Sequence, residues 1–219
     1  MTVRAVVFDL DGVLLDSEQV WDAARRELVR EAGGRWRGDA STAMLGMSAP
    51  EWSRYVAEEL GVPLPPAEID RAIVRRVVAR YHDELPALPG AREAVTRLAA
   101  RWPLGLATSS NREVVDVVLD ALGVADRFTA TVSSEEVGHG KPAPDVYLEA
   151  ARRLGADPSA CAAIEDSSNG LRSAARAGMR VLAIPNPHFP PDPDALALAA
   201  VVLPGLDALT PAVVAGDGR

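Results

Sequence analysis

The segment at residues 3–12 reads Val-Arg-Ala-Val-Val-Phe-Asp-Leu-Asp-Gly, an apolar run that stops at acidic residues. The run is short and rich in β-branched valines, which predicts a buried strand. Asp9 and Asp11 follow it directly, and Gly12 allows the chain to turn. This segment therefore predicts a strand that presents two carboxylates at its carboxyl end.

A helical region is predicted next, because no strand pattern is present between about residues 17 and 85. Apolar side chains recur there at helical spacing, and glycines and prolines separate the patterns. The three apolar faces contain Trp21, Ala24 and Leu28; Trp52, Val56 and Leu60; and Ile69, Ile73 and Val77. These patterns predict a helical insert that directly follows the first strand.

From residue 86 onward, predicted strands alternate with predicted helices. The strands are expected near residues 104–108, 129–132, 160–164, 180–184 and 200–203. Such alternation is typical of a parallel sheet covered by helices on both faces. We therefore expect an α/β protein with a Rossmann-like three-layer core at residues 1–16 and 86–219, and an inserted α-helical domain at residues 17–85.

Composition and charge restrict the possible partners. The chain has 219 residues, a net charge of −8 and a single cysteine, Cys161. The acidic balance argues against nucleic-acid binding, and one cysteine excludes an internal disulfide framework. Neither a signal peptide nor an apolar run of roughly 20 residues is apparent, so no membrane partner is expected. We expect a cytoplasmic monomer.

Polar residues follow four of the predicted strands and indicate one shared site. In a doubly wound sheet, ligands bind beyond the carboxyl ends of the strands. The residues expected there are Asp9 and Asp11, then Thr108 to Asn111, then Lys141, then Glu165 and Asp166. Carboxylates together with a hydroxyl and an ammonium group are typical of a site for a hard metal ion and a phosphate.

These residue types suit phosphoryl transfer. A carboxylate nucleophile must approach an anionic phosphate, and Mg²⁺ bound by carboxylates removes the repulsion. Asp9 and Asp166 suit direct metal ligation. Asp11 can donate a proton to the leaving alkoxide and then activate water. Thr108 and Lys141 can contact the phosphoryl oxygens, although Thr108 could instead cap the following helix.

Four ordered motifs give the chain a family resemblance. It resembles the haloacid dehalogenase-like superfamily at Phe8-Asp9-Leu10-Asp11-Gly12-Val13, Ala107-Thr108-Ser109-Ser110-Asn111, Gly140-Lys141-Pro142-Ala143-Pro144-Asp145 and Ile164-Glu165-Asp166-Ser167-Ser168-Asn169-Gly170. The helical insert occupies the position of this superfamily's small cap domain. The resemblance covers nearly the whole chain and implies an aspartyl-phosphate mechanism.

The resemblance also implies roles for individual residues. Asp9 is expected to be the nucleophile and a metal ligand, and Asp11 the acid and base, with its backbone carbonyl on the metal. Thr108 and Lys141 are expected to stabilise the phosphoryl group, and Asp166 to complete the Mg²⁺ site. Glu165 is expected to be a further metal ligand. Ser109 and Asn111 are expected to contact the substrate.

The first residues of the insert are similar to those of sugar phosphatases. Residues 16–21, Asp-Ser-Glu-Gln-Val-Trp, are similar to a segment of hexose-phosphate and 2-deoxyglucose-6-phosphate phosphatases. β-Phosphoglucomutases carry a histidine near the position of Trp21 and an arginine near residues 46–49, and both are absent here. Trp21 and Met47 are expected either to line the substrate pocket or to pack within the insert.

The predicted function is therefore Mg²⁺-dependent hydrolysis of a small phosphate ester, with a sugar phosphate as the expected substrate. Two alternatives remain open. One is a β-phosphoglucomutase-like isomerase that uses the same aspartyl-phosphate, and the other is a catalytically idle binding protein that keeps the fold.

Overall fold

The computed structural model describes residues 2–216, and a six-stranded parallel sheet lies at its centre. The strand order is β3-β2-β1-β4-β5-β6, which is the doubly wound order in which β1 lies between β2 and β4. The strands are β1 (Ala5–Phe8), β2 (Leu104–Thr108), β3 (Phe128–Ser133), β4 (Cys161–Glu165), β5 (Arg180–Ala183) and β6 (Val201–Val202). The predicted α/β fold is confirmed.

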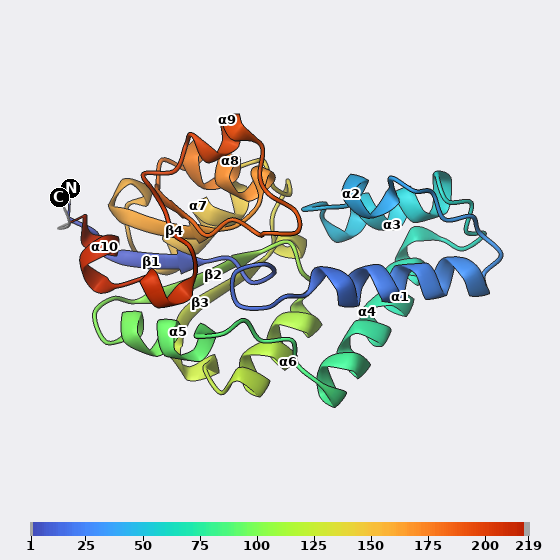
Figure 1. The fold of residues 1–219 in the computed structure, drawn as a ribbon, viewed down its shortest axis with the longest axis horizontal. Coiled ribbons are helices and arrows are strands. Elements are labelled where there is room, and N and C mark those ends of the chain that lie inside the picture. The colour runs from blue at the N-terminus through green and yellow to red at the C-terminus, as the bar shows by residue number, and fades with distance from the viewer. Residues whose placement is uncertain (1, 217–219) are drawn as a thin grey trace.

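Helices cover both faces of this sheet, with α5 and α6 on one side and α7 and α8 on the other (Figure 1). Alternate residues of β1 contribute to two separate apolar clusters, because Val6 and Phe8 face one helical layer while Ala5 and Val7 face the other. The layers are α5 (Ala91–Ala99), α6 (Arg112–Leu122), α7 (Asp145–Arg153) and α8 (Ser168–Arg176), followed by the short α9 (Pro193–Leu196) and α10 (Pro211–Ala215). The expected three layers are therefore present.

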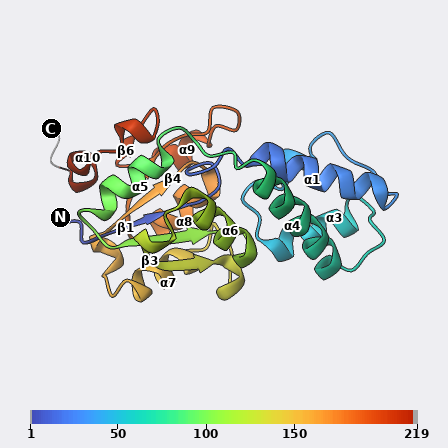
Figure 2. The same cartoon turned by 90° about the horizontal axis from the view of Figure 1, so that it is seen from below.

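Four further helices, here called the helical segment, lie beyond the carboxyl ends of the strands (Figures 1 and 2). They are α1 (Glu18–Glu31), α2 (Ala40–Ala43), α3 (Ala49–Glu58) and α4 (Pro66–Asp83). The chain enters and leaves this segment side by side, since the Asp16 amide donates to the Pro86 carbonyl at 2.8 Å and the Leu88 amide donates to the Leu14 carbonyl at 2.9 Å. None of the described helices is long and apolar enough to cross a membrane.

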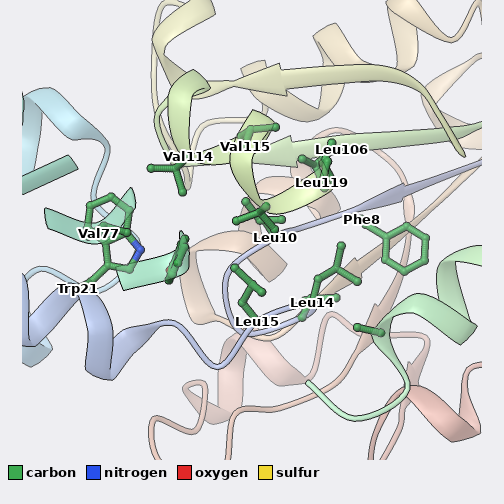
Figure 3. Packing of buried hydrophobic residues seen from close by; sticks show 14 of the residues in the cluster. Phe8, Leu10, Leu14, Leu15, Trp21, Val77, Leu106, Val114, Val115 and Leu119 are labelled. Atoms are coloured by element: carbon green, nitrogen blue, oxygen red, sulfur yellow. The ribbon is translucent and has the colours of Figure 1, made fainter. Parts of the chain in front are cut away.

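A continuous apolar cluster joins the helical segment to the sheet (Figure 3). Leu10, Leu14 and Leu15, from the loop after β1, are fully buried at this junction. Trp21 and Val77 extend the same cluster into the helical segment. The loop that follows Asp9 is thereby held from both sides, which fixes where its carboxylates point.

Candidate active site

Three carboxylates meet where β1 and β4 end. The two strands pair in parallel with Phe8 opposite Ile164, so Asp9 comes to lie beside Glu165. The Asp9 amide donates to the Ile164 carbonyl at 3.0 Å and extends the pairing by one step. Asp9, Glu165 and Asp166 each offer a carboxylate oxygen within 4.8 Å of the others. This is the point of the sheet at which the winding direction reverses, where doubly wound proteins bind ligands.

Lys141 lies among these carboxylates. Its Nζ is 2.8 Å from Asp9 Oδ1 and 2.6 Å from Glu165 Oε1, and the whole side chain is buried. Tyr147, on α7, donates from its hydroxyl to Glu165 Oε1 at 2.9 Å, and Lys141 Nζ lies 5.1 Å from the centre of its ring. The other oxygen of Glu165 accepts the backbone N–H of Asp166 at 2.9 Å. Glu165 and Tyr147 therefore fix the ammonium group of Lys141 next to Asp9.

Burial dominates the electrostatics of this cluster. It raises the pKa of Asp9 to about 8, although Lys141 acts in the opposite direction. Burial also raises the pKa of Asp166 well above its usual value, and the charges of Glu165 and Asp9 add to this effect. Burial alone would lower the pKa of Lys141, but the carboxylates of Asp9 and Glu165 outweigh it and raise that pKa. The cluster thus has an excess of buried carboxylates over buried cations.

The donor set of the cluster fits a magnesium ion. Asp166 Oδ1 is buried and has no hydrogen-bond partner among the described residues. A buried carboxylate oxygen without a partner is costly, and a bound cation removes that cost. Mg²⁺ prefers oxygen ligands and is commonly held by one or two carboxylates. Asp9 and Asp166 supply such oxygens within 4.8 Å of each other, at the ends of β1 and β4.

Glycines let the surrounding backbone approach these carboxylates closely. Gly12 has φ +78°, and a Cβ atom at this position would lie 1.9 Å from Asp166 Oδ2. A Cβ atom at Gly170, in α8, would lie 1.7 Å from Glu165 Oε1. No side chain larger than hydrogen therefore fits at either position without displacing a carboxylate.

Asp11 is held by contacts from two parts of the molecule. Ser110 Oγ donates to Asp11 Oδ2 at 2.5 Å, and Trp21 Nε1, from α1, donates to Asp11 Oδ1 at 3.3 Å. The Ser110 amide in turn donates to Thr108 Oγ1 at 3.0 Å. Asp11 therefore links the end of β2 to the helical segment. The Trp21 bond was not predicted from the sequence.

A cavity of about 630 Å³ lies between the strand ends and the helical segment. It brings together most of the predicted site residues, with Trp21 and Met47 contributed by the helical segment. The sheet side contributes Asp9, Asp11, Thr108, Ser109, Lys141 and Asp166. Glu165 lies behind Lys141 and is not part of the cavity wall.

Asn111 does not line this cavity, although it was expected to contact the substrate. Its Nδ2 donates to Asp70 Oδ1 on α4 at 3.1 Å and to Glu135 Oε1 at 2.9 Å. The side chain also makes no capping bond to α6, which begins at the next residue. Asn111 instead connects the helical segment to the loop after β3.

Four charged residues of the cavity wall were not predicted, namely Glu18 and Arg25 on α1 and, outside the helical segment, Arg172 and Asp192. Arg25 lies one helical turn after Trp21 on α1, and Glu18 lies at the start of the same helix. Burial raises the pKa of Glu18 to about 7, while Arg25 acts in the opposite direction. The spacing of Arg25 from Trp21 was the available signal, because residues four apart share one face of a helix.

Comparison with known proteins gives consistent matches. The family model described as haloacid dehalogenase-like hydrolase matches residues 3–178. Hexitol phosphatase B of Escherichia coli (strain K12) is 34% identical over 214 residues, which cover 95% of this chain and 95% of that protein. Fructose-1-phosphate phosphatase YqaB of the same strain is 31% identical over 176 residues, covering 80% of this chain and 92% of that protein.

A solved structure extends the likeness to the whole fold. The crystal structure of CbbY from Rhodobacter sphaeroides in complex with phosphate matches with a TM-score of 0.86 at 28% identity, covering 97% of this chain and 99% of that chain. The family model covers most of the residues that form the sheet and the cavity. The chain belongs to the haloacid dehalogenase-like hydrolase family.

Proposed function

We propose that the protein is a Mg²⁺-dependent phosphatase that hydrolyses a small phosphorylated metabolite, a sugar phosphate, through an aspartyl-phosphate on Asp9. The observation that carries the proposal is the buried cluster of Asp9, Lys141 and Asp166 at one wall of the cavity. The relatives named as hexitol phosphatase and fructose-1-phosphate phosphatase support a phosphorylated sugar or sugar alcohol as the substrate.

The first step transfers the phosphoryl group to the protein. An oxygen of the Asp9 carboxylate forms a bond to phosphorus while the bond to the leaving sugar oxygen breaks. Asp11 donates a proton to that oxygen, so the sugar leaves as an alcohol. Lys141 neutralises charge on the phosphoryl oxygens, and Thr108 donates a hydrogen bond to them.

The second step hydrolyses the aspartyl-phosphate and regenerates the free Asp9 carboxylate. Asp11, now a carboxylate, takes a proton from a water molecule, and that water attacks the phosphorus. The bond between phosphorus and the Asp9 oxygen breaks, which releases phosphate and the free carboxylate. Ser110 Oγ and Trp21 Nε1 hold Asp11 in place for both proton transfers.

The metal site in this proposal consists of Asp9, Asp166 and the backbone carbonyl of Asp11, with Glu165 as a further ligand. Mg²⁺ bound there would supply positive charge that allows an anionic substrate to approach Asp9. Glu165 already accepts hydrogen bonds from Lys141 and Tyr147. We therefore expect its main role to be the positioning of Lys141, and metal ligation to be secondary.

We further propose that residues 17–85 act as a cap domain on a core made of residues 1–16 and 86–219. The cap would exclude water until the phosphoryl group has transferred, and its side chains would select the substrate. Trp21 and Met47, which line the cavity from the helical segment, are the proposed cap contacts, and Ser109 is the proposed contact from the core.

The test is phosphate release from a panel of sugar and sugar-alcohol phosphates, with Mg²⁺ or with excess EDTA. Wild type is expected to release phosphate only with Mg²⁺, and Asp9→Asn is expected to release none. Asp126→Asn removes an exposed carboxylate and serves as the matched control that keeps full activity. No release from any ester by folded wild-type protein with Mg²⁺ present would refute the proposal.

The isomerase alternative is tested in the same reactions. A mutase returns an isomeric sugar phosphate and little free phosphate, whereas the proposed phosphatase returns free phosphate and a dephosphorylated sugar in equal amounts. Product analysis by nuclear magnetic resonance of ³¹P distinguishes these outcomes.

A further inference from the structure

Arg25 is a buried cation that has no ion-pair partner within residues 2–216. Its side chain, on α1, is only 6% exposed, and its Nε atom is fully buried with no hydrogen-bond partner among the described residues. Arg172, another arginine of the cavity wall, differs in this respect. It pairs with Asp192 and Asp194 at 2.8 Å each, whereas no described carboxylate pairs with Arg25 within 4.0 Å.

Two tryptophan rings fix the position of the Arg25 guanidinium. Its central carbon lies 5.2 Å from the ring centre of Trp21 and 5.4 Å from that of Trp52. The two rings pack edge to face with their centres 6.0 Å apart. Cation–π contacts of this kind hold the faces of a guanidinium and leave the N–H groups at its edge free for a ligand.

The same contacts place the guanidinium relative to the catalytic cluster. Trp21 donates its indole N–H to Asp11 at the edge of the ring, and the Arg25 guanidinium lies over the face of the same ring. Arg25 and Lys141 both line the cavity, one from the helical segment and the other from the sheet side. A substrate that contacts both walls meets Lys141 on one and Arg25 on the other.

Burial of this charge is costly without an anion. Burial lowers the pKa of Arg25, and Glu18, Asp22 and Asp11 act against that effect from beyond hydrogen-bond distance. A guanidinium nevertheless keeps its charge, because its pKa starts so high. A bound oxyanion would compensate the desolvated charge and use the free N–H groups in a bidentate contact.

We propose that Arg25 binds a second oxyanion of the substrate, a phosphate or a carboxylate, at the end remote from the phosphoryl group that Asp9 attacks. The inference rests on the phosphatase function proposed above and narrows its substrate class. The protein selects phosphate esters that carry a second anionic group over esters whose distal end is a neutral hydroxyl.

The test measures binding without turnover, in the Asp9→Asn protein with Mg²⁺, by titration calorimetry. Three open-chain six-carbon probes differ only at the distal end: glucitol 6-phosphate, gluconate 6-phosphate and glucitol 1,6-bisphosphate. At least one of the two doubly anionic probes is expected to bind roughly tenfold or more tightly than glucitol 6-phosphate. The tighter of the two identifies the oxyanion as a carboxylate or a phosphate.

Substitutions at Arg25 then separate binding from structure. Arg25→Met is expected to remove the preference for the second anion and to change glucitol 6-phosphate affinity by less than about threefold. Arg25→Lys keeps the charge without the planar fork and is expected to retain part of the preference. Arg30→Met, at an exposed position of the same helix, is the control that leaves all three affinities unchanged.

Equal affinity of the Asp9→Asn protein for all three probes would overturn the inference. This outcome is measured without any Arg25 variant. Equal weakening of all three probes by both Arg25 variants would also overturn it, because that result indicates a structural role. Failure of wild type to release phosphate from any ester would refute the phosphatase proposal but not the role of Arg25. The relative affinities of the three probes are measured without turnover.

Discussion

At the residue scale, Gly12 approaches the carboxylate of Asp166 very closely. The backbone at Gly12 has φ +78°, and a Cβ atom there would lie 1.9 Å from Asp166 Oδ2. Gly61 has a similar φ of +68° but has nothing within 4 Å of such a Cβ atom. The two glycines therefore share a left-handed backbone conformation, and only Gly12 lies against a carboxylate.

Gly12→Ala is expected to abolish Mg²⁺-dependent phosphate release, because the new methyl group must push the Asp166 carboxylate away from Asp9. Gly61→Ala should cost about 1–2 kcal/mol of stability from the left-handed backbone alone and leave activity unchanged. Phosphate release and thermal unfolding of both variants check this. Equal activity of the two variants would show that Asp166 need not keep its position.

Tyr147→Phe removes the hydroxyl that donates to Glu165, and it tests whether Glu165 positions Lys141. We expect a stability loss of about 1 kcal/mol and a kcat reduced roughly three- to tenfold, because Lys141 loses part of its fixed geometry. Tyr55→Phe is the control, since the Tyr55 hydroxyl is buried with no hydrogen-bond partner in the described chain. A wild-type kcat for Tyr147→Phe would argue against this positioning role.

The positions of many site residues could be anticipated from the sequence, because parallel strands end at one edge of a sheet. Asp9, Thr108 and Asp166 could thus be placed together from strand periodicity alone. The direction of Asn111 could not, because it depends on where Asp70 of α4 lies after folding. Arg25 was missed because its spacing of four residues from Trp21 shows that the two share a helix face, but not that this face lines a cavity.

At the element scale, the six strands and the longer helices followed from periodicity, whereas the shortest helices did not. α2 and α9 have four residues each and α10 has five. Such lengths span little more than one helical turn, so no apolar face can repeat within them. Their formation depends on local turns and on packing against neighbouring elements.

One contact between elements allows a test of whether the helical segment moves. Asn111 Nδ2, at the start of α6, donates to Asp70 Oδ1 on α4. Asp70→Ala removes this bond and should favour a more open arrangement, which would raise KM by about two- to fivefold and leave kcat nearly unchanged. Glu68→Ala, at an exposed position of the same helix, is the control. If both variants keep the wild-type KM, the contact does not restrain the helical segment.

At the scale of the whole molecule, buried like charges should make stability depend on a bound cation. The protein carries a net charge of −8, and Asp9, Glu165 and Asp166 are buried within reach of one another. Folding raises the pKa of Asp166 above its unfolded value, so its ionised form disfavours the folded state near pH 7. A cation held by Asp9 and Asp166 would reverse this cost.

Mg²⁺ is therefore expected to raise the thermal unfolding temperature, by roughly 5 to 10 °C at a concentration 100 times its Kd. Asp166→Asn removes one of the repelling carboxylates, so the metal-free variant should unfold at a higher temperature than metal-free wild type. The same variant should gain little from Mg²⁺, because it has lost a ligand.

Asp126→Asn, at an exposed site, should keep both the wild-type unfolding temperature without metal and the wild-type increase with Mg²⁺. Scanning calorimetry of the three proteins, each with Mg²⁺ or with EDTA, measures these unfolding temperatures. An Asp166→Asn protein that gains as much from Mg²⁺ as wild type would show that the cation binds elsewhere, and it would remove Asp166 from the proposed metal site.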